Sequence, residues 1–205
     1  MIVSRIHFGL PSRLHRCLMR PLSRPCCMKY LPLLLLTSLF LANCASTSAL
    51  KFTPGPGGET VTIPAHRMSL TLPPDWRIAQ NAPSGSTLFA AADNGNLRFV
   101  LAGPLGANDP GSKDALVANS VYQKGIQQAL AEGSFTKIER AGMFSLAGVN
   151  AFRCEASTRS KSQSILQVHV PHRNRIWVFS FYSTRQHISK VAAVPKILYS
   201  VQFLP

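Results

Sequence analysis

Alternation of apolar and polar residues runs through most of the chain after residue 60 and predicts short β-strands. The segment MSLTL at residues 68–72 is the first example, with its apolar side chains on one face. Residues 87–92 and 97–102 repeat the pattern and are separated by DNGN at 93–96, whose Asn and Gly accept positive φ, so a tight hairpin is expected. Four further strands are expected at residues 135–144, 150–158, 164–170 and 175–182.

Helical spacing is confined to two stretches of the chain. The first is expected to begin after Ser112, a good N-cap residue, and to end at Gly133. Its apolar stripe comprises Val117, Val121, Ile126, Ala129 and Leu130. The second helix is expected at residues 186–200, with a kink or restart at Pro195. Hairpins around a long helix predict an α+β fold, an antiparallel β-sheet sandwiched by helices.

Residues 28–44 have the order of a secretory signal: Lys29, an apolar run at 31–42, and then Cys44. The run is shorter than the roughly 20 residues of a membrane-spanning helix. Residues 41–44, Leu-Ala-Asn-Cys, resemble the bacterial lipoprotein box, which predicts a lipid on Cys44. Two alternatives stay open. Cleavage after small residues at 47–49 would give a soluble exported protein, and the run could instead be a buried core helix.

The sequence predicts four segments. Residues 1–27 hold five arginines and no acid, and are interpreted as a mis-assigned start or an extended n-region, with an Arg-rich targeting peptide as the alternative. Residues 28–43 are the predicted lipoprotein signal peptide. Residues 44–60, rich in Ser, Thr, Pro and Gly, are predicted to be a flexible tether. Residues 61–205 have the size of one domain.

The charge of the exported part is basic. Six of the 22 Lys and Arg residues precede Cys44, whereas all 8 acidic residues follow it, which leaves a net charge of about +8. Export makes nucleic acid an unsuitable partner, and an anionic membrane surface or acidic ligand is the better match. Only Cys154 would remain beside a lipidated Cys44, so we expect no disulfide and a buried, inert thiol.

Basic residues gather in the last third of the sequence, and their side chains suit anionic head groups or an acidic partner surface. The candidate anion-binding or partner-binding residues are Arg159, Lys161, His172, Arg173, Arg175 and Arg185. The alternative is an ordinary solvated surface of a basic protein. His169-x-x-His172 is not a recognised metal spacing, and no nucleophile elbow is present. We therefore expect no catalytic residue, no metal and no cofactor.

Several short motifs resemble the PsbP-like superfamily. They are the strand at 68–72 leading into Pro-Pro-Asp-Trp at 73–76, the long helix, Leu-Ala-Gly at 146–148 before Asn-Ala-Phe at 150–152, and Ile-Leu-Tyr-Ser-Val at 197–201. That superfamily includes an extrinsic photosystem subunit and many exported bacterial lipoproteins. The resemblance implies an antiparallel sheet between helices, binding or assembly roles, and no common active site.

The sequence thus predicts a non-catalytic, lipid-anchored cell-envelope protein that binds or stabilises another envelope component. Ala45 after Cys44 favours the periplasmic face of the outer membrane. One alternative is a chaperone or adaptor of a secretion system, which an exposed apolar groove beside the helix at 116–130 would favour. Another is an exported hydrolase, which a cleft joining His169 or His187 to Glu155 or Asp75 would favour.

Overall fold

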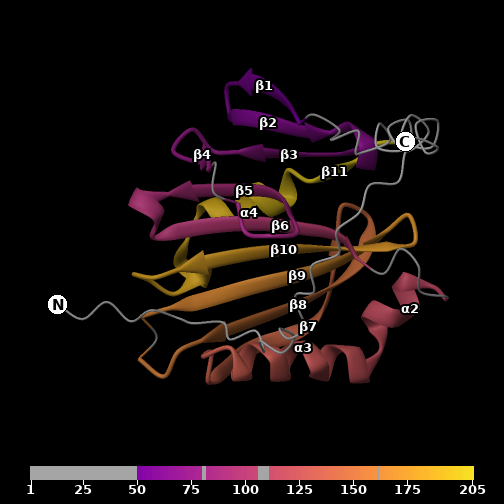
Figure 1. Ribbon diagram of the computed structural model, residues 1–205, viewed down its shortest axis with the longest axis vertical. Coiled ribbons are helices and arrows are strands. Elements are labelled where there is room, and N and C mark those ends of the chain that lie inside the picture. The colour runs from indigo at the N-terminus through magenta and orange to yellow at the C-terminus, as the bar shows by residue number, and fades with distance from the viewer. Residues whose placement is uncertain (1–49, 80–81, 106–110, 161) are drawn as a thin grey trace, which may run out of the picture. The chain divides into compact units, whose positions relative to one another are not determined.

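The predicted strands assemble into two antiparallel sheets in the computed structural model, which describes residues 50–79, 82–105, 111–160 and 162–205 (Figure 1). The larger sheet has the order β4 (Arg77–Ile78), β5 (Ser86–Ala92), β6 (Leu97–Leu105), β10 (Arg175–Ser183), β9 (Ser164–His172), β8 (Val149–Ser157) and β7 (Lys137–Leu146). The smaller sheet has the order β1 (Lys51–Gly55), β2 (Gly58–Ile63), β3 (Met68–Leu72) and β11 (Gln202–Phe203).

Helices cover both faces of the larger sheet. They are α2 (Lys113–Ala118), α3 (Ser120–Glu132) and α4 (Ala193–Tyr199), with short 3-10 turns η2 (Pro64–His66), η3 (Asp93–Gly95) and η4 (Ile188–Lys190). Ile197 of α4 belongs to the same core as Phe179 of β10, whereas Val117 and Leu130 of α2 and α3 belong to the core of Val178. Since residues 178 and 179 point to opposite faces, the sheet lies between helices, as an α+β fold requires.

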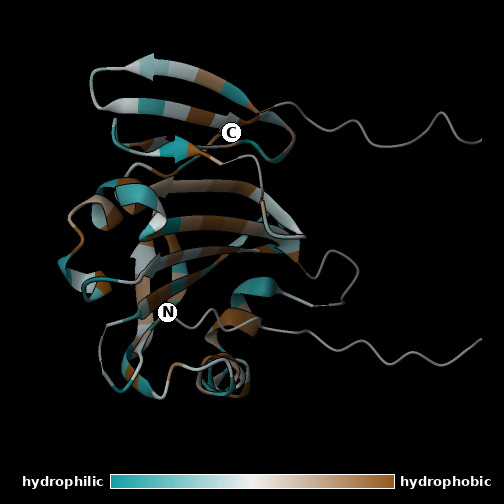
Figure 2. Cartoon of the chain, turned by 60° about the vertical axis from the view of Figure 1, so that its left-hand side comes forward, coloured by the Kyte–Doolittle hydropathy of each residue, from teal (hydrophilic) through white to brown (hydrophobic). Residues whose placement is uncertain are grey.

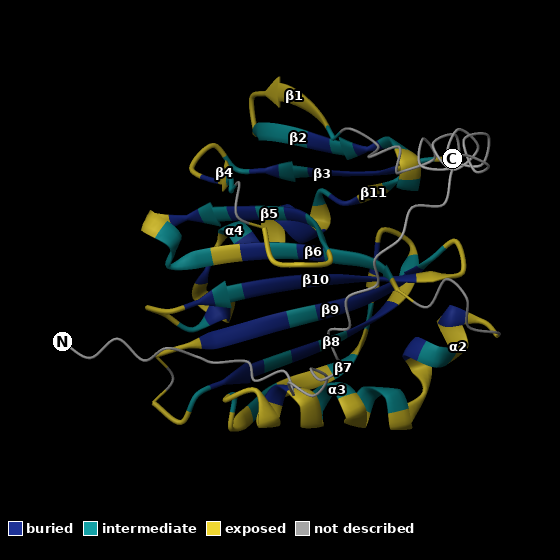
Figure 3. Cartoon of the chain, in the orientation of Figure 1, coloured by how far each residue is buried: buried dark blue, intermediate teal, exposed yellow. Residues whose placement is uncertain are grey.

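The central strands carry most of the buried surface. Figure 3 shows β9 and β10 buried along most of their length, and Figure 2 shows the hydrophobic residues concentrated in the middle of the larger sheet. Seven of the nine residues of β10 are buried, among them Trp177, Phe179 and Phe181. A strand that is packed on both faces is expected to carry apolar side chains on both faces, and β10 does.

The expected hairpin between residues 92 and 97 is confirmed. Ala92 pairs with Leu97, and η3 between them has positive φ at all three of its residues, 49°, 52° and 83°. Asp, Asn and Gly are among the residues that tolerate this conformation best, so the local sequence explains the turn.

Within the described ranges, every helix is too short or too polar to cross a bilayer.

The tether predicted at residues 44–60 is wrong from residue 51 onward. Lys51 to Gly55 pair with Thr62 to Gly58 and form the hairpin of β1 and β2. Pro54 is tolerated there because β1 is an exposed edge strand. Gly58 is required by packing: at its φ of 125°, a Cβ atom would lie 1.9 Å from the carbonyl oxygen of Leu72. The glycines thus end one strand and start another.

The long helix predicted after Ser112 is divided at Asn119. The side-chain oxygen of Asn119 accepts hydrogen bonds from the backbone N–H groups of Val121, at 2.7 Å, and Tyr122, at 3.4 Å. Asn119 therefore ends α2 and caps α3, which rotates the second helix relative to the predicted stripe. Val121, expected on the buried face, is 74% exposed as a result.

The C-terminal helix is shorter than predicted. Residues 186–200 contain η4 and then the seven-residue α4, joined near Val191. Pro195 is the third residue of α4 and causes no kink, because the N–H groups of the first turn have no partner within the helix. This arrangement packs α4 against β3, and its Val194, Ile197 and Leu198 belong to the core that both sheets share.

Candidate functional site

The basic residues predicted to form one site lie at two ends of the β9–β10 hairpin. His172, Arg173 and Arg175 surround its turn, whereas Arg159 and Arg185 lie beyond the opposite ends of the strands. Nine paired residues separate the two groups, which corresponds to about 30 Å at 3.3 Å per residue. The candidate basic residues therefore do not form a single site. Lys161 lies outside the described residues, as does Cys44.

Arg159 and Arg185 do not form a preorganised binding site. Both are exposed, and a guanidinium nitrogen of Arg185 lies 3.6 Å from a carboxylate oxygen of Asp93. A pair so open to solvent contributes little binding energy. His172, Arg173 and Arg175 occupy a separate corner with His66, which the sequence pattern did not single out.

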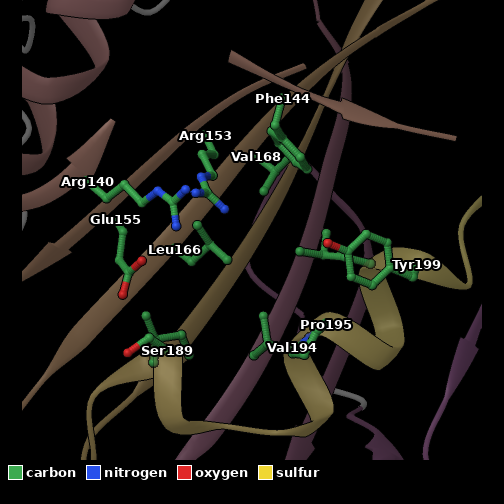
Figure 4. A pocket seen from close by; sticks show the side chains of 12 residues that line it. Arg140, Phe144, Arg153, Glu155, Leu166, Val168, Ser189, Val194, Pro195 and Tyr199 are labelled. Atoms are coloured by element: carbon green, nitrogen blue, oxygen red, sulfur yellow. The ribbon is translucent and has the colours of Figure 1, made fainter. Parts of the chain in front are cut away.

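A cavity of about 200 Å³ lies between α4 and the β7–β8–β9 part of the larger sheet (Figure 4). Its apolar wall includes Leu166 and Val168 from β9 and Val194 and Leu198 from α4. Its charged residues are Arg140, Arg153 and Glu155. We refer to it as the α4 pocket. An apolar wall with a few convergent polar groups is the usual composition of a ligand site.

Strand register explains how these residues meet. Arg140, Glu155 and Leu166 are paired across β7, β8 and β9, and Arg153 is paired with Val168 and, on its other side, with Gly142. Side chains in one cross-strand row share a face, so the arginines face α4 together. Gly142 contributes no side chain to its row, and a Cβ atom built there would meet nothing within 4 Å. The space beside Gly142, next to Arg153 in this row, is therefore open.

Neither arginine of the α4 pocket forms a salt bridge with a carboxylate of the described residues, although Glu155 lines the same pocket and interacts electrostatically with Arg140. Among the described residues, no acidic oxygen lies within 4.0 Å of either guanidinium, and Figure 4 shows both groups directed toward each other above Leu166. The guanidinium of Arg153 lies 5.5 Å from the centre of the Phe144 ring. The two guanidinium groups repel each other and the single carboxylate of Glu155 can offset only one of the two charges, so a bound anion would stabilise this arrangement by bidentate hydrogen bonds.

Glu155 closes one side of the pocket. Burial raises the pKa of its carboxyl, while the charges of His187 and Arg140 oppose that rise. His187 contributes an Nδ1 atom that lies 3.3 Å from a Glu155 oxygen and 2.8 Å from the Ser189 hydroxyl. A serine–histidine–acid relay needs the acid and the serine on different ring nitrogens, whereas here both contact the same one. The arrangement therefore suits a structural hydrogen-bond cluster.

The remaining candidates from the sequence are accounted for in other ways. His169 is 7% exposed and its Nδ1 atom lies 2.9 Å from the Tyr122 hydroxyl, so it joins β9 to α3 inside the core. Burial lowers the pKa of His169 to about 4. Asp75 is exposed. Cys154 is fully buried, as expected, and burial raises the pKa of its thiol to about 11, which disfavours the reactive thiolate.

Sequence reasoning missed Arg140 and Arg153. Both arginines lie in predicted strands. Arg140 is on the same strand face as Phe144, and Arg153 is on the same strand face as Ala151, and Phe144 and Ala151 both point into the protein. A charged residue at the apolar phase of a strand was the available signal. In the described part of the chain, no group of three His, Cys, Asp or Glu residues could hold a metal ion.

Comparison with known proteins gives only distant likenesses. No family model matches the sequence. No curated protein matches it either. Among solved structures, one from Bacteroides thetaiotaomicron has 14% identity and a TM-score of 0.42 over 76% of this chain, which spans about half, 48%, of that chain.

Two further structures show similar levels of likeness. LpqN of Mycobacterium tuberculosis, described as involved in cell envelope biogenesis, has 16% identity and a TM-score of 0.41 over 80% of this chain and 97% of its own. Protein PA94 of Pseudomonas aeruginosa, of unknown function, has 12% identity and a TM-score of 0.32 over 71% of this chain and 86% of its own.

Proposed function

We propose that this chain is a non-catalytic, lipid-anchored cell-envelope protein that binds an anionic envelope component in the α4 pocket. The observation that carries the proposal is the convergence of Arg140 and Arg153 over an apolar wall, with no salt bridge from either arginine to a carboxylate among the described residues. The anchor would be the lipid on Cys44, at the periplasmic face of the outer membrane. The finer assignment to the PsbP-like superfamily is part of the same proposal.

The composition of the pocket selects an amphiphile. A carboxylate or phosphate would be held by the two guanidinium groups, whose planar geometry matches two anion oxygens. A hydrocarbon segment would contact Leu166, Val168 and Leu198. Each 100 Å² of apolar surface removed from water contributes about 2.5 kcal/mol, so the tail and the head group would both stabilise the complex.

The proposed anchor would hold the pocket near its ligands. The first described strand begins at Lys51, so six residues, 45–50, separate it from Cys44, and seven Cα–Cα steps join the two. Such a link reaches at most about 25 Å when fully extended. Each buried methylene of an attached acyl chain contributes about 0.8 kcal/mol, and several chains would make release very slow. The domain would thus stay within reach of membrane amphiphiles.

The two alternative functions find less support. For a hydrolase, His187 and Glu155 do lie together beside Ser189, but both partners share one imidazole nitrogen, which does not permit proton relay from serine to acid. For a secretion chaperone, an exposed apolar groove would be needed beside residues 116–130, whereas Val117 and Leu130 are buried in the core with β8 and β9.

Native mass spectrometry of protein purified from envelope membranes tests the proposal. We expect wild type to retain an anionic amphiphile, and the Arg140→Gln/Arg153→Gln double variant to lose it. Arg159→Gln is the matched control, since Arg159 is exposed and outside the pocket. Equal retention by the double variant, or a wild-type protein that carries only neutral amphiphiles, would overturn the assignment of the pocket.

A further inference from the structure

A second cluster of basic side chains lies at the opposite end of β9 and β10 from Arg185. A cavity of about 200 Å³ there is lined by Ala65, His66, His172, Arg173, Arg175 and Trp177. His66 ends η2, between β2 and β3, and the other basic residues surround the β9–β10 turn. Two segments about 100 residues apart in sequence thus contribute to one cavity, which we call the His/Arg corner.

Both imidazoles are held by aromatic contacts. The ring of His66 lies 4.7 Å from that of Trp177, and the ring of His172 stacks at 4.2 Å on Phe203 of β11. The backbone N–H of Leu204 donates to the carbonyl of Arg67 at 2.7 Å, which fastens the end of β11 to the residue after η2. The two imidazoles are therefore positioned before any ligand arrives, which lowers the entropic cost of binding.

The corner has a surplus of positive charge. Among the described residues, no acidic one lines it. The pKa of His66 is lowered by burial and then by Arg175, and that of His172 by burial and then by Arg173. Arg67, next to His66, adds a further cation, whose guanidinium donates to the Pro205 carbonyl at 2.8 Å. Within the described ranges, the buried Nε2 of His172 has no hydrogen-bond partner. The corner thus offers donors and positive charge that suit an anion.

We infer that the His/Arg corner binds a phosphate-type dianion, independently of the α4 pocket. Arg173 and Arg175 would supply fork-like donors and most of the charge, and the imidazole N–H groups of His66 and His172 would supply further hydrogen bonds. A dianion with at least three free oxygens uses more of these donors than a carboxylate can. Inorganic phosphate and the phosphomonoester of a head group share this chemistry.

Phosphate titration followed by imidazole NMR tests the inference on protein purified from cells that express the full chain. The signals of His66 and His172 are assigned from His66→Gln and His172→Gln. We expect saturable shifts of both signals in wild type and at least tenfold weaker binding in Arg173→Gln/Arg175→Gln. Arg185→Gln, with an exposed arginine at the other end of the hairpin, is expected to bind as wild type does.

Titration with glycerol phosphate distinguishes the two sources of the dianion. Binding at least fivefold tighter than inorganic phosphate indicates a head-group monoester, and equal or weaker binding indicates free phosphate. The inference is overturned if neither compound gives a saturable shift, or if Arg185→Gln weakens binding as much as the double variant. The melting temperature of the double variant shows whether it is folded. His66→Gln provides an independent second variant, in which weaker binding is also expected.

Discussion

Atom Nδ1 of His187 lies 3.3 Å from Oε1 of Glu155, so the segment before η4 is joined to β8 at the rim of the α4 pocket. The charge of His187 lowers a carboxyl pKa that burial raises. Replacement of His187 by Gln is therefore predicted to raise the pKa of Glu155 further. Carboxyl-carbon NMR titration of both proteins measures this change, and an equal or lower Glu155 pKa in the variant would contradict the electrostatic coupling.

His169 predicts a loss of stability in mild acid. Burial lowers its pKa from the ordinary value of 6.5 to about 4 in the folded chain, so the unfolded chain binds more protons between these values. Stability is predicted to fall as pH drops from about 6.5 to 4, by roughly 3 kcal/mol in total from this residue. Urea unfolding at pH 7 and 5 should show a smaller loss in His169→Gln. His66 and His172 are present in both proteins, so their contributions to the pH dependence cancel in the comparison. An identical loss of stability in the variant would therefore refute the role of His169.

Trp76 is predicted to anchor the core that the two sheets share. It follows the Pro73–Pro74 turn, is 4% exposed and belongs to the same core as Leu72 and Ala90. Trp76→Ala should lower the free energy of unfolding by about 3–5 kcal/mol because it removes a large buried ring. Trp76→Phe is the control and should cost less, since the orphaned indole N–H has no hydrogen-bond partner within the described residues. An unchanged melting temperature in Trp76→Ala would exclude this role.

Lipid attachment at Cys44 is predicted to hold the protein at the membrane. If Cys44 carries lipid, wild-type protein from washed membranes begins at a modified Cys44, and Cys44→Ala becomes soluble. The measurement is the N-terminal mass together with fractionation of both proteins. Cys154→Ala is a suitable control, because that buried cysteine has no part in anchoring. An unmodified start near Leu50 would mean export without an anchor, and retention of residues 1–27 would contradict the interpretation of the whole leader.

Periodicity predicted most of the strands because each depends on local alternation. Seven strand segments of the sequence correspond to β3 and β5 to β10 in the structure. The β1–β2 hairpin was not predicted, since five Pro and Gly residues at 54–58 read as a linker. Its formation depends on pairing of β2 with β3, a contact between segments that local pattern does not report.

The binding residues were harder to predict than the fold. Clustering along the sequence placed Arg159 with Arg173, although the antiparallel hairpin carries them to opposite ends. Arg140 and Arg153 are 13 residues apart and meet because of strand register, which a single sequence does not fix. His66 and His172 line one cavity because the two sheets pack together, and a single sequence does not show that contact either.

The most direct test of the account is a titration of the wild-type protein with octyl phosphate and octyl glucoside, which share a tail and differ in head-group charge. Octyl phosphate is predicted to bind at least about tenfold more tightly, corresponding to roughly 1.4 kcal/mol for charge-assisted hydrogen bonds. Because the His/Arg corner could also hold the phosphate group, the decisive comparison is made in the Arg173→Gln/Arg175→Gln background. There the preference should disappear when Arg140→Gln/Arg153→Gln is added and persist when Arg159→Gln is added. Equal affinity of the Arg173→Gln/Arg175→Gln protein for the two amphiphiles, or a preference that survives the addition of Arg140→Gln/Arg153→Gln, would contradict the proposal that the α4 pocket binds an anionic envelope component.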